Sequence, residues 1–269
     1  MSKIEQKTAD TNDGVVTYRE LGSGTPLVLL HGIGSGSESW RAQLLDFGKL
    51  YHVIAWDAPG YGGSTPVAPS TPSAADYARR LETFLDALGV ATCHLVGHSL
   101  GAIMACRFAR DKSERVKSLM LASPAMGYGS QGKEIQNERR TGRIELLETL
   151  GPKGLARERH ANLLSAAAPK WARDRVEKVM GEIRPHGYRQ AVELLVLNNI
   201  LADTVEILSP VSVVVGGADV VTPPETCKLI AESFPNSTFK ILPDLGHACY
   251  VEGPEIFNVL LRGHLDKNS

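Results

Sequence analysis

Ser99 lies between two glycines in the stretch GHSLG, residues 97–101. The apolar run CHLV precedes this stretch and the helix-like run AIMACRFA follows it. A serine on a sharp turn between a strand and a helix adopts a strained backbone that holds its hydroxyl clear of the sheet. Gly97 and Gly101 leave room for the close approach of strand and helix, where a Cβ would clash. The stretch therefore predicts that Ser99 is a catalytic nucleophile.

A serine hydroxyl needs a base, and that base needs a carboxylate to orient it. His247 follows the last predicted strand, and Asp219 follows the strand before it. Functional sites in open α/β sheets gather at the carboxyl ends of the strands. We therefore predict a catalytic triad of Ser99, His247 and Asp219. Asp244, three residues before His247, is the alternative acid.

The glycine-rich loop HGIGSGS, residues 31–37, is the second element that chemistry at Ser99 requires. A tetrahedral oxyanion is stabilised by donors that are already in place. We predict that the backbone N–H groups of Ile33 and Leu100 supply them, with Gly34 as the alternative to Ile33. His31 is expected to hold the loop. A phosphate cradle is the competing interpretation, but the loop lacks the G-K-[ST] ending of such cradles.

The elements that carry these residues alternate between strand and helix patterns. Apolar runs predict strands at 14–21, 27–32, 51–57, 93–99, 116–124, 211–219 and 237–247. Helical spacing predicts helices at 38–50, 74–89, 100–111, 222–234 and 254–265. Ser73 and Asp76 form a capping box, and Thr222 is the predicted N-cap of its helix. Such alternation indicates an α/β protein with a mostly parallel, doubly wound sheet.

Residues 125–209 break this rhythm, because they contain helical patterns and no convincing strand. The patterns cover 132–151, 153–167, 169–183 and 186–201, and three prolines separate them: Pro152, Pro169 and Pro185. The strand pattern resumes at Pro210. We interpret 125–209 as a helical cap, or lid, over the carboxyl edge of the sheet, and residues 1–124 with 210–269 as the core domain. An ordinary satellite helical domain is the simpler alternative.

The cap must select the substrate, and its charged residues leave that choice open. The candidates for substrate contact in and around the site are Gly32, Gly34, His98, Met126, Tyr128, Arg143, Trp171 and Arg173. An arginine can bind a substrate carboxylate through two hydrogen bonds, and the cap offers four for this role: Arg139, Arg143, Arg173 and Arg175. The alternative is a solvated face paired with glutamates at 138, 145 and 177.

Composition excludes several classes of partner. The chain has 269 residues, a net charge of −1 and 22% charged residues, so no field of one sign favours nucleic acid or an anionic membrane. No apolar stretch reaches the ~18 residues of a membrane span, and the N-terminus lacks a signal-peptide core. The four cysteines are scattered without metal-ligand spacing. We expect a cytoplasmic protein with a small-molecule substrate and no cofactor or metal; a homodimer is left open.

Five stretches resemble the α/β-hydrolase superfamily, in the order that family shows them: HGIG, DAPGYGGS, GHSLG, GGADVVTP and GHACYVEGPE. The resemblance covers nearly the whole chain. It implies an α/β-hydrolase fold with a mostly parallel eight-stranded sheet flanked by helices. It also implies an antiparallel second strand, an inserted helical cap after the sixth strand, and the triad Ser99–His247–Asp219. It does not specify the substrate.

We expect hydrolysis of a small carboxylic ester or lactone through an acyl-serine intermediate. One alternative is a C–C bond hydrolase acting on a vinylogous 1,5-diketone acid from aromatic degradation. In the resembled family, that branch typically has Asn before the nucleophile and Trp after the catalytic histidine, where this chain has His98 and Ala248. A ligand-binding, receptor-like hydrolase with slow turnover is a second hypothesis, and a lipase acting at a membrane surface is a third.

Overall fold

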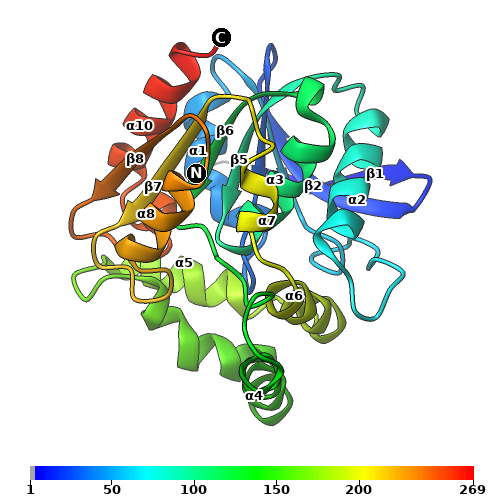
Figure 1. Ribbon diagram of the computed structural model, residues 1–269, viewed down its shortest axis with the longest axis vertical. Helices are drawn as coiled ribbons and strands as arrows, with labels where there is room; N and C mark the ends of the chain where they lie inside the picture. Colours follow the sequence, from blue (N-terminus) through cyan, green and yellow to red (C-terminus); the bar gives the residue numbers. More distant parts are fainter. Residues whose placement is uncertain (1–3) are drawn as a thin grey trace.

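An eight-stranded sheet runs through the centre of the protein in a computed structural model that describes residues 4–269 (Figure 1). The strands are β1 (Lys7–Thr11), β2 (Gly14–Leu21), β3 (Pro26–Leu30), β4 (His52–Trp56), β5 (Cys93–His98), β6 (Val116–Ala122), β7 (Val211–Gly216) and β8 (Ser237–Leu242). Their order in the sheet is β1-β2-β4-β3-β5-β6-β7-β8. Strand β2 is antiparallel to both of its neighbours, and all pairs from β4 to β8 are parallel. The predicted eight-stranded, mostly parallel sheet is confirmed.

Helices cover both faces of this sheet. The helices outside residues 125–209 are η1 (Ser37–Trp40), α1 (Arg41–Phe47), α2 (Ala74–Ala87), α3 (Leu100–Asp111), η2 (Ser113–Arg115), α8 (Pro224–Glu232), α9 (Cys249–Glu252) and α10 (Pro254–Asp266). The capping box predicted at the start of α2 is present, because the backbone N–H of Ser73 donates to Asp76 Oδ2 at 2.9 Å. Gly89 ends that helix region with φ of 67°.

The central strands are apolar throughout because each is buried on two faces. In β3, Leu27 and Leu29 pack in the core cluster that includes α1 and α10. Val28 and Leu30, which alternate with them, pack in the cluster that includes α2, α3 and α8. Side chains of a strand point alternately to its two faces, so one continuous apolar run supplies both cores.

Residues 125–209, here called the cap segment, form helices between β6 and β7. They are α4 (Lys133–Arg159), η3 (His160–Leu163), α5 (Lys170–Met180), α6 (Pro185–Leu197) and α7 (Leu201–Thr204). The first two predicted helices both lie within α4 and are separated at Gly151, where φ of 64° and ψ of 175° are not helical, just before Pro152. Figure 1 shows α4, α5 and α6 gathered below the sheet.

Ion pairs hold the cap segment together and join it to the core. Arg140 of α4 pairs with Glu193 of α6 at 2.7 Å. The buried carboxylate of Asp203 in α7 pairs with Arg107 and Arg110 of α3, each at 2.9 Å. The end of the cap segment is therefore fixed to the helix that follows Ser99. No helix within residues 4–269 has both the length and the apolar character to cross a membrane.

The predicted strands differ from the observed ones at the first sheet edge and at several carboxyl ends, most of all at the last strand. The residue patterns did not predict β1, an edge strand in which only Ala9 is buried. The last strand was predicted to reach residue 247, but β8 ends at Leu242. Asp244 has φ of 62°, a left-handed conformation that ends an extended strand.

Candidate active site

Ser99 occupies the sharp turn between β5 and α3. Its backbone has φ of 52° and ψ of −116°, a conformation that is strained for a residue with a Cβ. The N–H of Ser99 donates to Ala122 O at 3.0 Å. Its carbonyl accepts the N–H groups of Ala102 at 3.0 Å and Ala125 at 3.1 Å. These three bonds hold the predicted nucleophile in its strained turn from β6, from α3 and from the start of the cap segment.

The two glycines flanking Ser99 are required by close backbone approach. A Cβ on Gly97 would lie 2.6 Å from the carbonyl oxygen of Gly101. A Cβ on Gly101 would lie 2.5 Å from the carbonyl oxygen of Leu30, at the end of β3. Both distances are shorter than any van der Waals contact, and the opposing atoms are backbone. The strand–turn–helix arrangement anticipated around Ser99 is therefore built on these two positions.

His247 and Asp219 form a buried pair at the carboxyl edge of the sheet. Nδ1 of His247 lies 2.9 Å from Oδ2 of Asp219, and each residue is only 3% exposed. Burial alone would raise the pKa of Asp219, but the hydrogen bond and charge of His247 and the N–H of Thr222 lower it to about 2. Asp219 is thus a charged acceptor that fixes the proton on His247 Nδ1, which leaves Nε2 as the free base.

Thr222 contacts both members of the His247–Asp219 pair, a role that the sequence patterns did not predict. It was predicted as the N-cap of a helix, but α8 begins at Pro224 and its N-cap is Pro223. The hydroxyl of Thr222 instead lies 2.9 Å from Asp219 Oδ2 and 3.1 Å from His247 Nδ1. Its N–H and that of Val221 donate to Asp219 Oδ1 at 2.9 and 2.8 Å. These donors hold the carboxylate in place.

His98 contacts the predicted base rather than open solvent. Its Nε2 donates to the carbonyl oxygen of His247 at 3.0 Å, and its ring packs 4.8 Å from the His247 ring and 4.7 Å from the Tyr250 ring. Burial holds the pKa of His98 well below its usual value, aided by the charge of His247. His98 is therefore a neutral residue that supports the segment carrying His247.

The Ser99 hydroxyl makes no hydrogen bond to any of the residues described. Catalytic hydrogen bonds in free enzymes are often long and tighten only when substrate binds. The N–H of Leu100, at the first position of α3, has no acceptor within that helix, as is general for helix N-termini. This N–H lies at the end of α3 that adjoins Ser99, and it is available as a donor to a bound group.

The loop after β3 approaches Ser99 as closely as glycine permits. A Cβ on Gly32 would lie 2.8 Å from Ser99 Cβ. The N–H of Gly34 is directed to Tyr61 Oη at 3.5 Å, which favours Ile33 over Gly34 as the second oxyanion donor. His31 lies 2.9 Å from Gly32 O through Nδ1, and its Nε2 accepts the N–H of Ala58 at 3.0 Å. This pattern fits the loop-holding role expected of His31.

Glu252 is a second residue that the sequence patterns did not single out. Its buried Oε2 accepts the N–H groups of Ser165 at 3.0 Å and Gly246 at 2.9 Å, and Oε1 accepts the Ser165 hydroxyl. The N–H of Ala248 donates to Leu163 O at 2.8 Å. The cap segment at 163–165 is therefore bonded directly to Ala248 and, through Glu252, to Gly246, the two neighbours of His247.

Tyr128 and two of the four candidate arginines meet at one place in the cap segment. The guanidinium carbons of Arg139 and Arg143 each lie 5.6 Å from the centre of the Tyr128 ring. Arg143 also lies 3.5 Å from Tyr128 Oη, while Arg139 is 3.9 Å from Glu138. Tyr128 and Met126 are half-buried against the core, and neither is among the residues that line the cavity beside His247.

Helix α5 presents the remaining candidates on two different sides. Trp171 is 50% exposed, and Arg173 is an exposed residue that donates to Ala166 O at 2.9 Å. Arg175 instead lines a cavity that also contacts His98 and His247. Of the candidates on this helix, Arg175 lines that cavity, whereas Trp171 and Arg173 are not among its lining residues.

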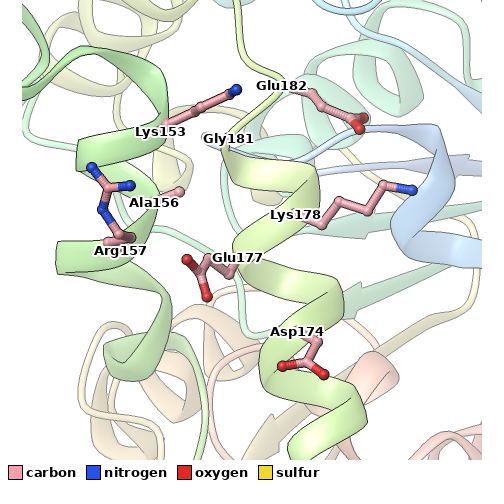
Figure 2. A pocket seen from close by; sticks show the side chains of 8 residues that line it. All are labelled: Lys153, Ala156, Arg157, Asp174, Glu177, Lys178, Gly181 and Glu182. Atoms are coloured by element: carbon pink, nitrogen blue, oxygen red, sulfur yellow. The ribbon is translucent and has the colours of Figure 1, made fainter.

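Two hollows in the cap region differ in size and position. The cavity beside His247 is small, at about 20 Å³, and is lined partly by Ile33, Arg175 and Val179. A wider cleft of about 400 Å³ lies between the second half of α4 and α5, with Lys153 and Arg157 on one side and Lys178 among acidic residues on the other (Figure 2). None of the residues lining this cleft belongs to the predicted triad, whereas His247 lines the small cavity.

No group of three or more histidine, cysteine, aspartate or glutamate side chains within residues 4–269 is arranged to hold a metal ion. The four cysteines are buried thiols. Burial raises the pKa of three of them, Cys93, Cys227 and Cys249, to about 12. At neutral pH these three thiols are therefore uncharged and are not nucleophiles that compete with Ser99.

Comparison with known proteins adds a family match and relatives of several activities. A family model described as the alpha/beta hydrolase fold matches residues 25–254. The dihydrolipoyllysine-residue acetyltransferase component of the acetoin cleaving system of Cupriavidus necator is 29% identical over 94% of this chain and 67% of its own length. The 2-hydroxy-6-oxo-6-phenylhexa-2,4-dienoate hydrolase of Comamonas testosteroni is 34% identical over 48% of this chain and 46% of its own. A thermophilic esterase from Thermogutta terrifontis has 25% identity and a TM-score of 0.88, covering 98% of this chain and all of that one.

Proposed function

The chain belongs to the α/β-hydrolase family, and we propose that it hydrolyses a small carboxylic ester or lactone through an acyl-serine intermediate. In this proposal Ser99 is the nucleophile, His247 the general base and Asp219 the orienting acid. The observation that carries the proposal is the buried His247–Asp219 hydrogen bond of 2.9 Å. It fixes which nitrogen of His247 is free to take the proton of a serine hydroxyl.

Acylation begins when Ser99 Oγ attacks the ester carbonyl and His247 Nε2 takes the hydroxyl proton. The charge that develops on the carbonyl oxygen is stabilised by the backbone N–H groups of Ile33 and Leu100. The tetrahedral intermediate collapses as the C–O bond to the alcohol breaks, and His247 returns its proton to that leaving oxygen. The product is an alcohol and an acyl group bonded to Ser99.

Deacylation repeats these steps with water in place of the serine. His247 Nε2 takes a proton from water, whose oxygen attacks the acyl carbon. Collapse of the second tetrahedral intermediate breaks the bond to Ser99 Oγ, which receives the proton from His247. Free acid is released and Ser99 is restored. The charged Asp219 stabilises the imidazolium in both halves of the reaction, because its lowered pKa keeps it ionised at neutral pH.

The C–C hydrolase alternative has some support from the partial match to the Comamonas testosteroni enzyme. His98 and Ala248 argue against it, since the resembled branch has Asn and Trp there. His98 donates to the carbonyl of His247, so its side chain is engaged in supporting the base.

The closed surroundings of Ser99 favour small acyl groups. Ser99 is 5% exposed, and the cavity beside His247 has a volume of only about 20 Å³. A buried CH₂ group would add about 0.8 kcal/mol of binding, but a closed pocket withholds that gain from long chains. We therefore expect kcat/KM to be highest for short acyl groups and to fall beyond about eight carbons.

The test measures kcat/KM for aryl esters from acetate to palmitate, beside a 2-hydroxy-6-oxo-dienoic acid. Ser99→Ala is the control and should lose on the order of 10³–10⁶ in kcat. An organophosphonate probe should label Ser99 stoichiometrically. Efficient cleavage of the dienoic acid with feeble ester turnover would make the C–C hydrolase alternative correct, and a probe adduct on another serine would overturn the mechanism.

A further inference from the structure

Three parts of the chain supply most of the wall of the small cavity beside His247, and Ser39, His98 and Leu163 complete it. The loop after β3 contributes Ile33, Gly34 and Ser35, and the segment that follows β8 contributes residues 247–251 apart from Cys249. Helix α5 closes the remaining side with Arg175, Val176 and Val179. The cavity therefore touches both the predicted base and the loop of the predicted oxyanion donor, so a group bound there lies next to the reacting carbonyl.

Arg175 is the cationic residue in this wall, and its charge is not matched by a direct partner. Among the residues described, its half-buried guanidinium makes neither a hydrogen bond nor an ion pair. Burial lowers the pKa of Arg175, the charge of Glu38 raises it and the charge of Arg41 lowers it. A guanidinium has five N–H donors in a fixed plane, so this side chain retains its capacity to bind an anion.

Glu38 is the carboxylate near Arg175, but it is already shared. It lies 2.9 Å from Arg19 Nε and 3.5 Å from a guanidinium nitrogen of Arg41. Glu38 therefore forms its ion pairs with Arg19 and Arg41 and forms none with Arg175. An anion that enters this cavity would reach Arg175 without having to displace an ion pair of that side chain.

We propose that Arg175 is a substrate-binding residue that takes a carboxylate, so that the substrate is an ester or lactone carrying a second, free carboxylate group. The inference rests on the proposed function, because it places that carboxylate a few atoms from the carbonyl attacked by Ser99. A cavity of about 20 Å³ has room for about one water-sized group. This size fits the oxygens of a flat carboxylate better than a tetrahedral phosphate.

The first experiment compares matched substrates with and without the charge. One pair is an aryl pentanoate and the aryl monoester of glutaric acid, which differ in a terminal methyl and a terminal carboxylate. The second pair is an aryl acetate with and without a carboxylate on the ring, which moves the charge to the alcohol side. In one of these pairs the wild-type protein should prefer the charged member by roughly 10–100-fold in kcat/KM, as a charge-assisted hydrogen bond supplies.

Variants then assign this preference to one side chain. Arg175→Gln should reduce the charged-over-neutral ratio by roughly 10–100-fold, and Arg175→Lys should restore part of it because the charge remains without the bidentate geometry. Lys170→Gln is the matched control, since it removes one positive charge from the same helix at a side chain that is 86% exposed. A ratio that is unchanged in Arg175→Gln, or that falls equally in Lys170→Gln, overturns the inference.

A binding measurement separates this inference from the proposed function. Succinate, a small dicarboxylate, should bind the wild-type protein in a calorimetric titration and bind Arg175→Gln at least tenfold more weakly. If no ester is hydrolysed but succinate binding depends on Arg175, the carboxylate site stands and the proposed reaction fails. If esters are hydrolysed but neither the substrate ratio nor succinate binding depends on Arg175, the proposed function stands and the carboxylate site fails.

Discussion

Replacing Asp219 with asparagine should abolish catalysis while leaving most of the fold intact. The two carboxylate oxygens of Asp219 have different partners. Oδ1 accepts two backbone N–H groups, and Oδ2 faces His247 and Thr222. An asparagine has one oxygen, and the two backbone donors favour it on their side. Its NH₂ group then faces His247 Nδ1, which must give up its proton to accept the new hydrogen bond. The proton moves to Nε2, and the base is lost.

The size of both effects follows from this geometry. The wrong tautomer of His247 should reduce kcat on the order of 10⁴-fold. The lost charge affects stability less, because lowering the pKa of Asp219 from 3.8 to about 2 corresponds to roughly 2 kcal/mol. A carboxylate whose pKa is lowered by folding stabilises the protein above pH ~4, and this contribution disappears as the pH falls toward 2.

The assay pairs ester turnover with urea unfolding for the wild-type protein, Asp219→Asn and Asp244→Asn. Asp244 is exposed, and asparagine tolerates its φ of 62°, so this control should lose roughly tenfold or less in kcat. The stability difference between wild type and Asp219→Asn should narrow between pH 5 and pH 2. A loss of kcat under tenfold in Asp219→Asn, or a larger loss in Asp244→Asn, would refute the assignment of the acid.

Three further predictions concern the support of the site. Gly97→Ala should lower the free energy of unfolding in urea by at least about 2 kcal/mol, because its Cβ would lie 2.6 Å from a backbone oxygen. Gly142→Ala, in open space on α4, is the control and should be neutral or stabilising. Equal effects of the two substitutions would contradict the close-approach argument. Glu252→Ala should lower the free energy of unfolding by about 2–4 kcal/mol, because two buried N–H groups lose their acceptor. Glu252→Gln keeps an oxygen at that position and should lower it by less than about 1 kcal/mol. Equal losses would show that these hydrogen bonds do not stabilise the fold. Burial lowers the pKa of His94 to about 4, so the neutral side chain stabilises the fold fully above pH ~6.5 and less as the pH drops toward 4. Between pH 6.5 and 5, the free energy of unfolding should therefore fall by about 2 kcal/mol less in His94→Asn than in the wild type. Identical pH profiles of stability for the two proteins would refute this.

The sheet could be predicted from the sequence because most of its strands are buried on both faces. Their continuous apolar runs end at turn residues, and α2 between them begins at a capping box. Strand β1 lacks this signal: its sequence KTADT has one buried residue at the sheet edge, so only the family resemblance implied an eighth strand. The end of β8 at Leu242 was also missed, although Pro243 follows it directly and cannot donate to a strand ladder.

The candidate site was predictable where chemistry demands particular residue types at strand ends. Thr222 and Glu252 were not, because a threonine or glutamate near a turn has many ordinary roles. Glu252 meets Ser165 across 87 positions of sequence, a distance at which no local pattern operates. The choice between Arg173 and Arg175 was open for a similar reason. Residues two apart on a helix point about 200° apart, so one faces inward, but spacing alone does not say which.

The bonds between the cap segment and the His247 segment have a consequence for protein engineering. Exchanging residues 125–209 for the equivalent insertion of another hydrolase would remove Leu163 O and both donors of Ser165, which bind Ala248 and Glu252. A Cβ on Gly246 would lie only 2.4 Å from the backbone carbon of Leu164, so the two segments are also fitted by shape. The cap is therefore not an interchangeable module. A chimera designed to alter substrate choice must retain positions 163–165, or it will disturb the base along with the pocket.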